Sequence, residues 1–172
     1  MIARVFLIAL VAVAAFGVEV SPEAAALSKQ MTAAEKAIDR HFRAIGSGET
    51  VAMIGTARGI YLADYGAVFS VEVNLIPMAN LSPFRSAYTE EEKRQLNVRK
   101  RQRMETLEQQ MREVLMKEGA GLSEVGVDQH VALAVSLFHF PWEDLTQLPS
   151  QVVMAGARGE LGSRESLTTR YY

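Results

Sequence analysis

An apolar run at the N-terminus decides how much of the chain is left to fold. Arg4 precedes an unbroken apolar run over residues 5–16, and the small residue Gly17 follows it. A basic start, a short apolar run and a small-residue exit are typical of a secretory signal peptide. The run is shorter than the roughly 20 apolar residues of a spanning helix, and Pro22 stops it from continuing. We therefore expect cleavage near Gly17 and an exported, periplasmic or secreted protein, with retention as a membrane anchor as the alternative.

The remaining chain has the length of one domain. About 155 residues follow the signal peptide. A chain of this length can bury a sizeable core without disulfide bonds to stabilise it. The absence of cysteine excludes thiol nucleophiles, Cys-ligated zinc and iron–sulfur clusters. A net charge of −2 gives no global attraction to nucleic acid. We expect a signal peptide at 1–17, a single α+β domain at 18–162 and a mobile polar tail at 163–172.

Two long helices are indicated by their start residues. Ser21 before Pro22 is typical of a helix start, and apolar residues at spacings of three and four continue as far as a stop at Gly46. Thr89 and Glu92 have the spacing of a capping box, and this second helix runs to about residue 118. Both helices are predicted from local sequence alone.

Residues 50–76 are typical of a β-hairpin, because apolar and polar residues alternate over 67–75. A three-residue loop with Gly66 in the left-handed conformation would place Arg58 opposite Glu72, and a two-residue loop would place it opposite Val71. We prefer the first register. Gly55, Ala57 and Gly59 would then share a face on which a helix packs closely.

The last third of the chain predicts a strand and a helix. Residues 129–140 are apolar on both faces, which favours a buried strand at the centre of the sheet. Pro149 predicts the start of a third helix, although Gly156 and Gly159 disfavour one. The expected fold is α+β: a small antiparallel sheet of a hairpin and a third strand, packed against three helices in the order α-β-β-α-β-α.

The first half of the second helix is the most conspicuous charged segment. It lacks an apolar stripe, so we expect residues 89–103 to project from the body as a basic arm. The preceding loop carries apolar side chains such as Phe84, which either cover the core or extend this surface. Export disfavours nucleic acid and favours an envelope protein or an anionic surface, with membrane contact at most peripheral. An ordinary solvated helix face is the alternative. The predicted interaction residues are Lys93, Arg99, Lys100, Arg101, Arg103 and Phe84.

Catalytic patterns are nearly absent from the sequence. There is no Gly-x-Ser-x-Gly segment. His139 with Glu143 and Asp144 could bind a metal or act as a base, but no third ligand is evident, and Glu72 is a lone carboxylate. We expect no catalytic residues, no metal and no cofactor. The sequence thus favours a non-catalytic binding module that uses the 76–103 loop and basic helix.

Two alternatives of other classes stay open. One is a small metal-dependent or hydrolytic enzyme around His139 and Glu143. The other is a small-molecule or lipid carrier, in which helices cover a cavity on the face of residues 55–59.

Overall fold

The protein, described here from a computed structural model, is a mixed α+β structure with one five-stranded sheet and two long helices. The described residues are 21–46, 51–76, 88–143, 146 and 148–172. The helices are α1 (Pro22–Gly46) and α2 (Glu90–Val114), and a π-helical turn over Leu115–Gly119 continues α2. The strands are β1 (Ala52–Leu62), β2 (Gly66–Asn74), β3 (His130–Leu137), β4 (Gln151–Ala157) and β5 (Thr168–Tyr171). Among these residues, no helix is long and apolar enough to cross a membrane.

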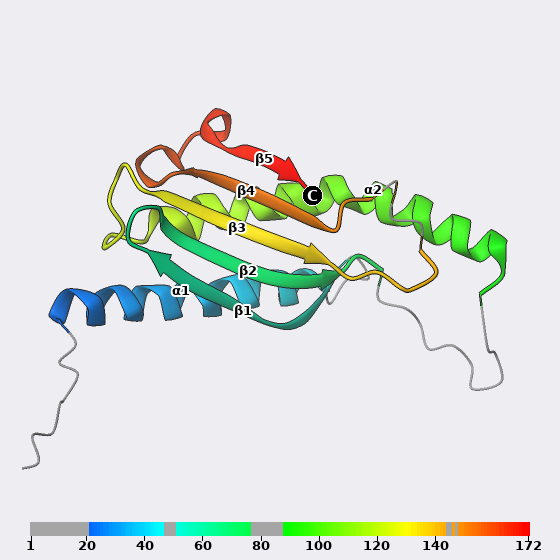
Figure 1. The fold of residues 1–172 in the computed structure, drawn as a ribbon, viewed down its shortest axis with the longest axis horizontal. Helices are drawn as coiled ribbons and strands as arrows, with labels where there is room; N and C mark the ends of the chain where they lie inside the picture. Colours follow the sequence, from blue (N-terminus) through cyan, green and yellow to red (C-terminus); the bar gives the residue numbers. More distant parts are fainter. Residues whose placement is uncertain (1–20, 47–50, 77–87, 144–145, 147) are drawn as a thin grey trace, which may run out of the picture.

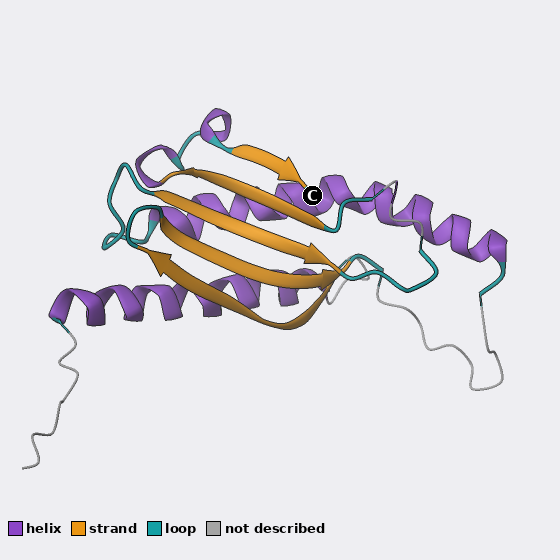
Figure 2. Cartoon of the chain, in the orientation of Figure 1, coloured by secondary structure: helices purple, strands orange, loops and turns teal. Residues whose placement is uncertain are grey.

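The strands lie side by side in chain order, β1-β2-β3-β4-β5. Neighbouring strands are antiparallel except β2 and β3, which are parallel because α2 lies between them in the chain. Both long helices lie on one face of the sheet, behind the strands in Figures 1 and 2. We call this the helix face and the opposite side the open face.

The core lies between the sheet and the two helices. Alternate residues of β2, β3 and β4 point into it, as the burial of Phe69, Leu133 and Met154 shows. Phe42 of α1 and Leu107 and Met111 of α2 close it from the other side and are fully buried. Alternation of this kind is expected of strands with one face covered.

Helix α1 also protects the outer edge of β1. Residues four apart on a helix advance about 6 Å, close to the roughly 6.7 Å between alternate residues of a strand. Glu35 Oε1 accepts a hydrogen bond from Gly59 N at 2.7 Å, and Asp39 Oδ1 accepts one from Ala57 N at 2.6 Å. Arg43 donates to the carbonyl of Gly55 at 2.7 Å. Two amides and one carbonyl that another strand could use at this edge are thus occupied by side chains.

Both predicted helix starts are confirmed. The Ser21 hydroxyl accepts a hydrogen bond from Ala24 N at 3.2 Å, and α1 runs from Pro22 to Gly46. The capping box of Thr89 and Glu92 is present at the start of α2. The strand predicted at 129–140 is also central, between β2 and β4.

The third helix predicted after Pro149 is wrong, because these residues form β4. Val152, Met154 and Gly156 alternate with less buried residues and pair with β3. Residues 163–172, predicted to be a mobile tail, contain β5, which pairs with β4. The element order is therefore α-β-β-α-β-β-β, with two long helices rather than three and two strands more than expected.

The predicted hairpin is present, but its register is wrong. Leu62 pairs with Gly66 around a three-residue loop, so Arg58 lies opposite Ser70 rather than Glu72. Gly66 has φ +124°, and a Cβ there would lie 2.1 Å from the carbonyl oxygen of His130. Because Gly66 lets β2 and β3 approach so closely, it belongs to the ladder and not to the turn.

Within the observed hairpin, a bulge in β1 between Ile54 and Arg58 shifts the pairing with β2. Ile54 pairs with Glu72, and Gly55 adopts φ +74° inside the bulge. Gly55 is exposed with nothing packed above it, so its predicted place under a helix is wrong. Gly59 does lie in such a place, because a Cβ on it would meet Met31 of α1 at 2.9 Å.

Candidate functional site

The predicted basic arm contains a buried lysine. The Lys100 side chain is only 2% exposed, so the expectation that it projects into solvent is wrong. Its ammonium lies 2.6 Å from both carboxylate oxygens of Glu143 and 3.0 Å from the carbonyl oxygen of Phe138. An ammonium has three hydrogens to donate, and these three contacts use all of them. Lys100 therefore connects α2 to the 138–143 segment through these hydrogen bonds.

His139 completes this buried cluster. Its Nδ1 lies 3.2 Å from Glu143 Oε2, and its Nε2 lies 3.2 Å from the carbonyl oxygen of Pro149. A carboxylate and a carbonyl only accept hydrogen bonds, so a neutral imidazole can donate to one of them and a protonated imidazole to both. The sequence grouped His139 with Glu143 correctly, but Asp144 lies outside the described residues.

Aromatic rings cover the Lys100–Glu143–His139 cluster. Lys100 Nζ lies 5.7 Å from the centre of the Phe140 ring, which stacks on Trp142 at 5.4 Å. Trp142 in turn contacts Tyr88 and lies 5.8 Å from Lys93 Nζ. Because the Glu143 side chain is also 2% exposed, neither charge of the pair is open to a substrate. The arrangement holds the fold together and offers no reacting group at the surface.

The other predicted cations of α2 differ in their surroundings. Lys93 forms an ion pair with Glu90 at 2.6 Å, and Arg103 donates to the carbonyl of Leu75 at 2.6 Å. The pKa of Glu90 is lowered by the hydrogen bond from Lys93 and by its charge. Arg99 and Arg101 are exposed. Phe84 lies outside the described residues, so of the five predicted interaction residues that are described only these two arginines are exposed.

The open face of the sheet is the surface that the sequence did not single out. The registers align its side chains in rows across all five strands. One row is Arg58–Ser70–Ala134–Val153–Arg170, and the next is Ile60–Val68–Ala132–Ala155–Thr168. Small residues therefore occupy the three central strands, and larger side chains stand on β1 and β5. The result is a shallow floor with an arginine at either side.

Part of the open face is apolar and exposed. Ile60 is 57% exposed and Leu62 is 46% exposed, both on β1. The sequence showed apolar residues on both faces of β3 and predicted burial on both, but only one face lies against the helices. No helix covers the other face of β3, and its side chains, such as Ala134, are small and apolar, so they rise little above the sheet.

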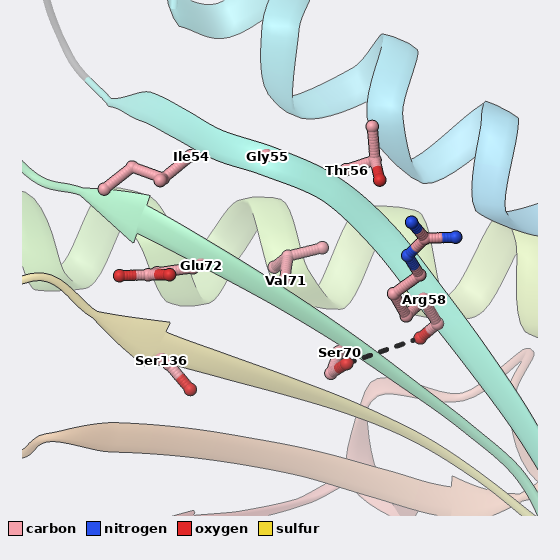
Figure 3. Close-up of a pocket in the computed structure, with 8 residues that line it drawn as sticks. All are labelled: Ile54, Gly55, Thr56, Arg58, Ser70, Val71, Glu72 and Ser136. Atoms are coloured by element: carbon pink, nitrogen blue, oxygen red, sulfur yellow. Dashed lines mark hydrogen bonds between the residues drawn. The ribbon is translucent and has the colours of Figure 1, made fainter.

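A first hollow lies where β1 bulges away from β2. It has a volume of about 400 Å³, and Figure 3 shows the residues that line it, among them Ser70, Glu72 and Ser136 on neighbouring strands. Arg58 and Glu72 point away from each other, and no ion pair joins them in the described structure. The carboxylate of Glu72 is therefore available to a ligand or partner, whereas the sequence assigned it to Arg58.

A second hollow lies at the β4–β5 side of the same face. It has a volume of about 310 Å³. Its lining combines aromatic, basic and hydroxyl-bearing side chains over a small apolar floor: Tyr65, His130, Val153, Ala155, Thr168, Arg170 and Tyr172. From the sequence, Arg170 and Tyr172 were predicted to lie in a tail and His130 at an exposed strand start. No sequence pattern indicated that these three residues lie near one another. The pairing of β3 with β4 and of β4 with β5 brings them together.

Metal chemistry has little support in the described part of the chain. No group of three or more His, Asp or Glu side chains lies close enough there to hold an ion. Comparisons with protein-family models, with curated proteins and with solved structures find no match. The geometry of this chain is therefore the only basis for inferring its function.

Proposed function

We propose that this protein is a non-catalytic binding protein and that its binding surface is the open face of the sheet. The observation that carries the proposal is the contrast between the two faces. The helix face is packed and buried, whereas the open face combines exposed apolar side chains, two hollows and polar side chains. Exposed apolar area with polar groups at its margins is characteristic of interaction sites.

The proposal moves the working surface away from the 76–103 segment. In the described part of that segment, Lys100 and Arg103 are committed to internal contacts. The partner class expected from the sequence, an envelope protein, is kept, but its contact is assigned to the open face. Export remains part of the proposal, and residues 1–17 are its support.

The buried cluster favours binding over the enzymatic alternative. A hydrolytic or metal-dependent site at His139 and Glu143 would need its carboxylate open to substrate, and that side chain is 2% exposed. The carrier alternative needs space between α1 and the 55–59 segment. Gly59 lies in close contact there with Met31 and Phe69.

Site-specific photo-cross-linking in cells that make the full chain tests the proposed surface. A photoreactive residue at Ile60, on the open face, is compared with one at Val98, which is 43% exposed on α2. We expect a defined cross-linked species from position 60 and its loss on the additional substitution Ala134→Arg, which raises a charged side chain from the floor. Equal cross-linking from positions 60 and 98, or none from position 60, would overturn the proposal.

The enzymatic alternative has its own test. Glu143→Gln should alter stability without abolishing any hydrolytic activity, because no reacting group is exposed. A hydrolytic activity of the purified protein that Glu143→Gln removes, with the fold intact by circular dichroism, would favour the enzyme instead.

A further inference from the structure

The hollow at the β4–β5 side of the open face has the features of a site for a small anion. Arg170 stands on β5 opposite Val153, and His130 begins β3. Within the described residues, the Arg170 guanidinium and the His130 ring nitrogens have no hydrogen-bond or ion-pair partner. The lining contains no carboxylate side chain. Two unpaired donor groups with no carboxylate side chain beside them favour a negatively charged ligand.

The remaining lining residues favour a planar ligand. Tyr65 stacks on His130 with ring centres 5.2 Å apart and planes inclined by 22°, and Tyr65 O accepts the His130 amide at 2.7 Å. These contacts fix one aromatic wall before any ligand arrives. Tyr172 supplies a second ring, and Val153 and Ala155 form a floor low enough to admit a flat group. Aromatic faces attract other planar groups at ring distances of about 4.5–7 Å.

The main-chain acceptor nearest this site already has donors within the sheet. One main-chain oxygen of Tyr172 accepts hydrogen bonds from the amides of Ser150 and Gln151 at 2.6 and 3.1 Å and from the Ser150 hydroxyl at 3.0 Å. The Thr168 hydroxyl donates to the carbonyl of Ala155 at 3.2 Å and retains its capacity to accept. The volume of about 310 Å³ lies at the small end of the range for ligand pockets, roughly 300–1,000 Å³.

From these observations we infer that the hollow formed by Tyr65, His130, Thr168, Arg170 and Tyr172 binds a small planar anion, a ring that carries a carboxylate or a phosphate. Arg170 contacts the anionic group and the Tyr65–His130 stack contacts the ring. This inference rests on the proposed function, since it specifies the ligand class of one part of the open face.

Titration of the full chain with 4-hydroxybenzoate and with phenyl phosphate tests it and separates the two sources of charge. Binding is followed by calorimetry and by amide shifts of β3, β4 and β5. Phenol, which lacks the anion, and inorganic phosphate, which lacks the ring, are the matched ligand controls. We expect saturable binding of at least one planar anion, and binding at least tenfold weaker for phenol and inorganic phosphate.

Variants identify the residues responsible. Arg170→Gln should weaken binding about tenfold or more, because a hydrogen bond to a charged group is lost. His130→Asn removes the stacked ring and should also weaken it. Arg99→Gln, an exposed arginine on α2, is the matched control and should leave the affinity unchanged. All three positions are exposed, so the variants should fold.

The possible failures are distinguishable. If neither anion binds, or if Arg99→Gln weakens binding as much as Arg170→Gln, this ligand assignment is overturned. Equal affinity for inorganic phosphate and phenyl phosphate would overturn the planar part of it. Cross-linking from position 60 does not involve this hollow, so it can still succeed and leave the proposed function standing.

Discussion

The Lys100 ammonium and the Glu143 carboxylate, 43 residues apart in the chain, meet at 2.6 Å with each side chain 2% exposed. This contact ties α2 to the segment that leaves β3. Two charges taken out of water are stable there only as a pair, because each compensates the desolvation of the other. The contact is therefore a sensitive point of the fold.

Lys100→Met should lower the free energy of unfolding by about 3–5 kcal/mol, because it leaves the Glu143 carboxylate buried without a counter-charge. Urea unfolding monitored by circular dichroism measures the loss. Arg99→Met, one residue earlier and exposed, is the control and should change stability by no more than about 0.5 kcal/mol.

The double variant Lys100→Met with Glu143→Leu gives a further check. Replacing a buried pair by apolar side chains of similar size is often neutral, so most of the lost stability should return. If the double variant were less stable than Lys100→Met alone, the unpaired carboxylate would not be the cause of the loss.

The second prediction concerns the protected edge of β1. The double variant Glu35→Ala with Asp39→Ala leaves the amides of Gly59 and Ala57 without partners, at a cost of about 1 kcal/mol for each hydrogen bond. The uncovered edge should also recruit other chains, because unpaired strand edges template further pairing. Urea unfolding and sedimentation velocity measure the two effects.

Isosteric variants provide the control for the edge. Glu35→Gln with Asp39→Asn retains an oxygen that can accept at each position, so these chains should stay unassociated. Association of the isosteric variants to the same extent would show that charge, rather than hydrogen bonding to the edge, keeps the chains apart.

The third prediction concerns Gly66. A methyl group there would lie 2.1 Å from the carbonyl oxygen of His130, at φ +124°. Gly66→Ala should therefore cost more than about 3 kcal/mol, which places it among the severe single substitutions. Thermal unfolding measures it against Gly162→Ala, where a Cβ would meet nothing within 4 Å. Similar losses for the two variants would contradict the role given to Gly66 in the β2–β3 pairing.

Local residue patterns were sufficient for the two helices and for the presence of the hairpin, but not for its register. Ser21 with Pro22, and Thr89 with Glu92, act within one turn of the helices that they begin, so the sequence alone contains their signal. Strand β4 has no such local mark. Val152 and Val153 after Pro149 suit a helix or a strand, and pairing with β3 decides between them. Gly156, unfavourable to a helix, is required in β4 because Leu161 and Leu167 pack against it.

The candidate site was harder to predict than the fold. Lys100 stands in a run of exposed cations, and its burial depends on Glu143, which no local pattern links to it. The bulge at Gly55 separates Arg58 from Glu72, which a regular hairpin would have paired. The second hollow requires two strands that the sequence did not predict. Contacts distant in sequence therefore decide every part of the open face.

The last prediction is a pH dependence of stability that arises from His41. Burial lowers the pKa of His41 below its usual value of 6.5, and its Nε2 has no hydrogen-bond partner in the described structure. Glu113 and Glu118 raise the pKa and Lys117 lowers it, but burial is the largest influence. The folded protein therefore holds this histidine neutral more firmly than the unfolded chain does.

The sign follows from proton uptake. Between the lowered folded pKa and the unfolded value near 6.5, the unfolded chain binds more protons, so acidification favours unfolding. The contribution of His41 is complete above about pH 6.5 and is lost as the pH falls toward its folded pKa. Urea unfolding across this window should show a shallower pH dependence for His41→Phe than for the native chain. Thr32→Ala, an exposed change on the same helix, is the control and should keep the pH dependence of the native chain. If His41→Phe showed the same pH dependence as Thr32→Ala, His41 would be excluded as its cause.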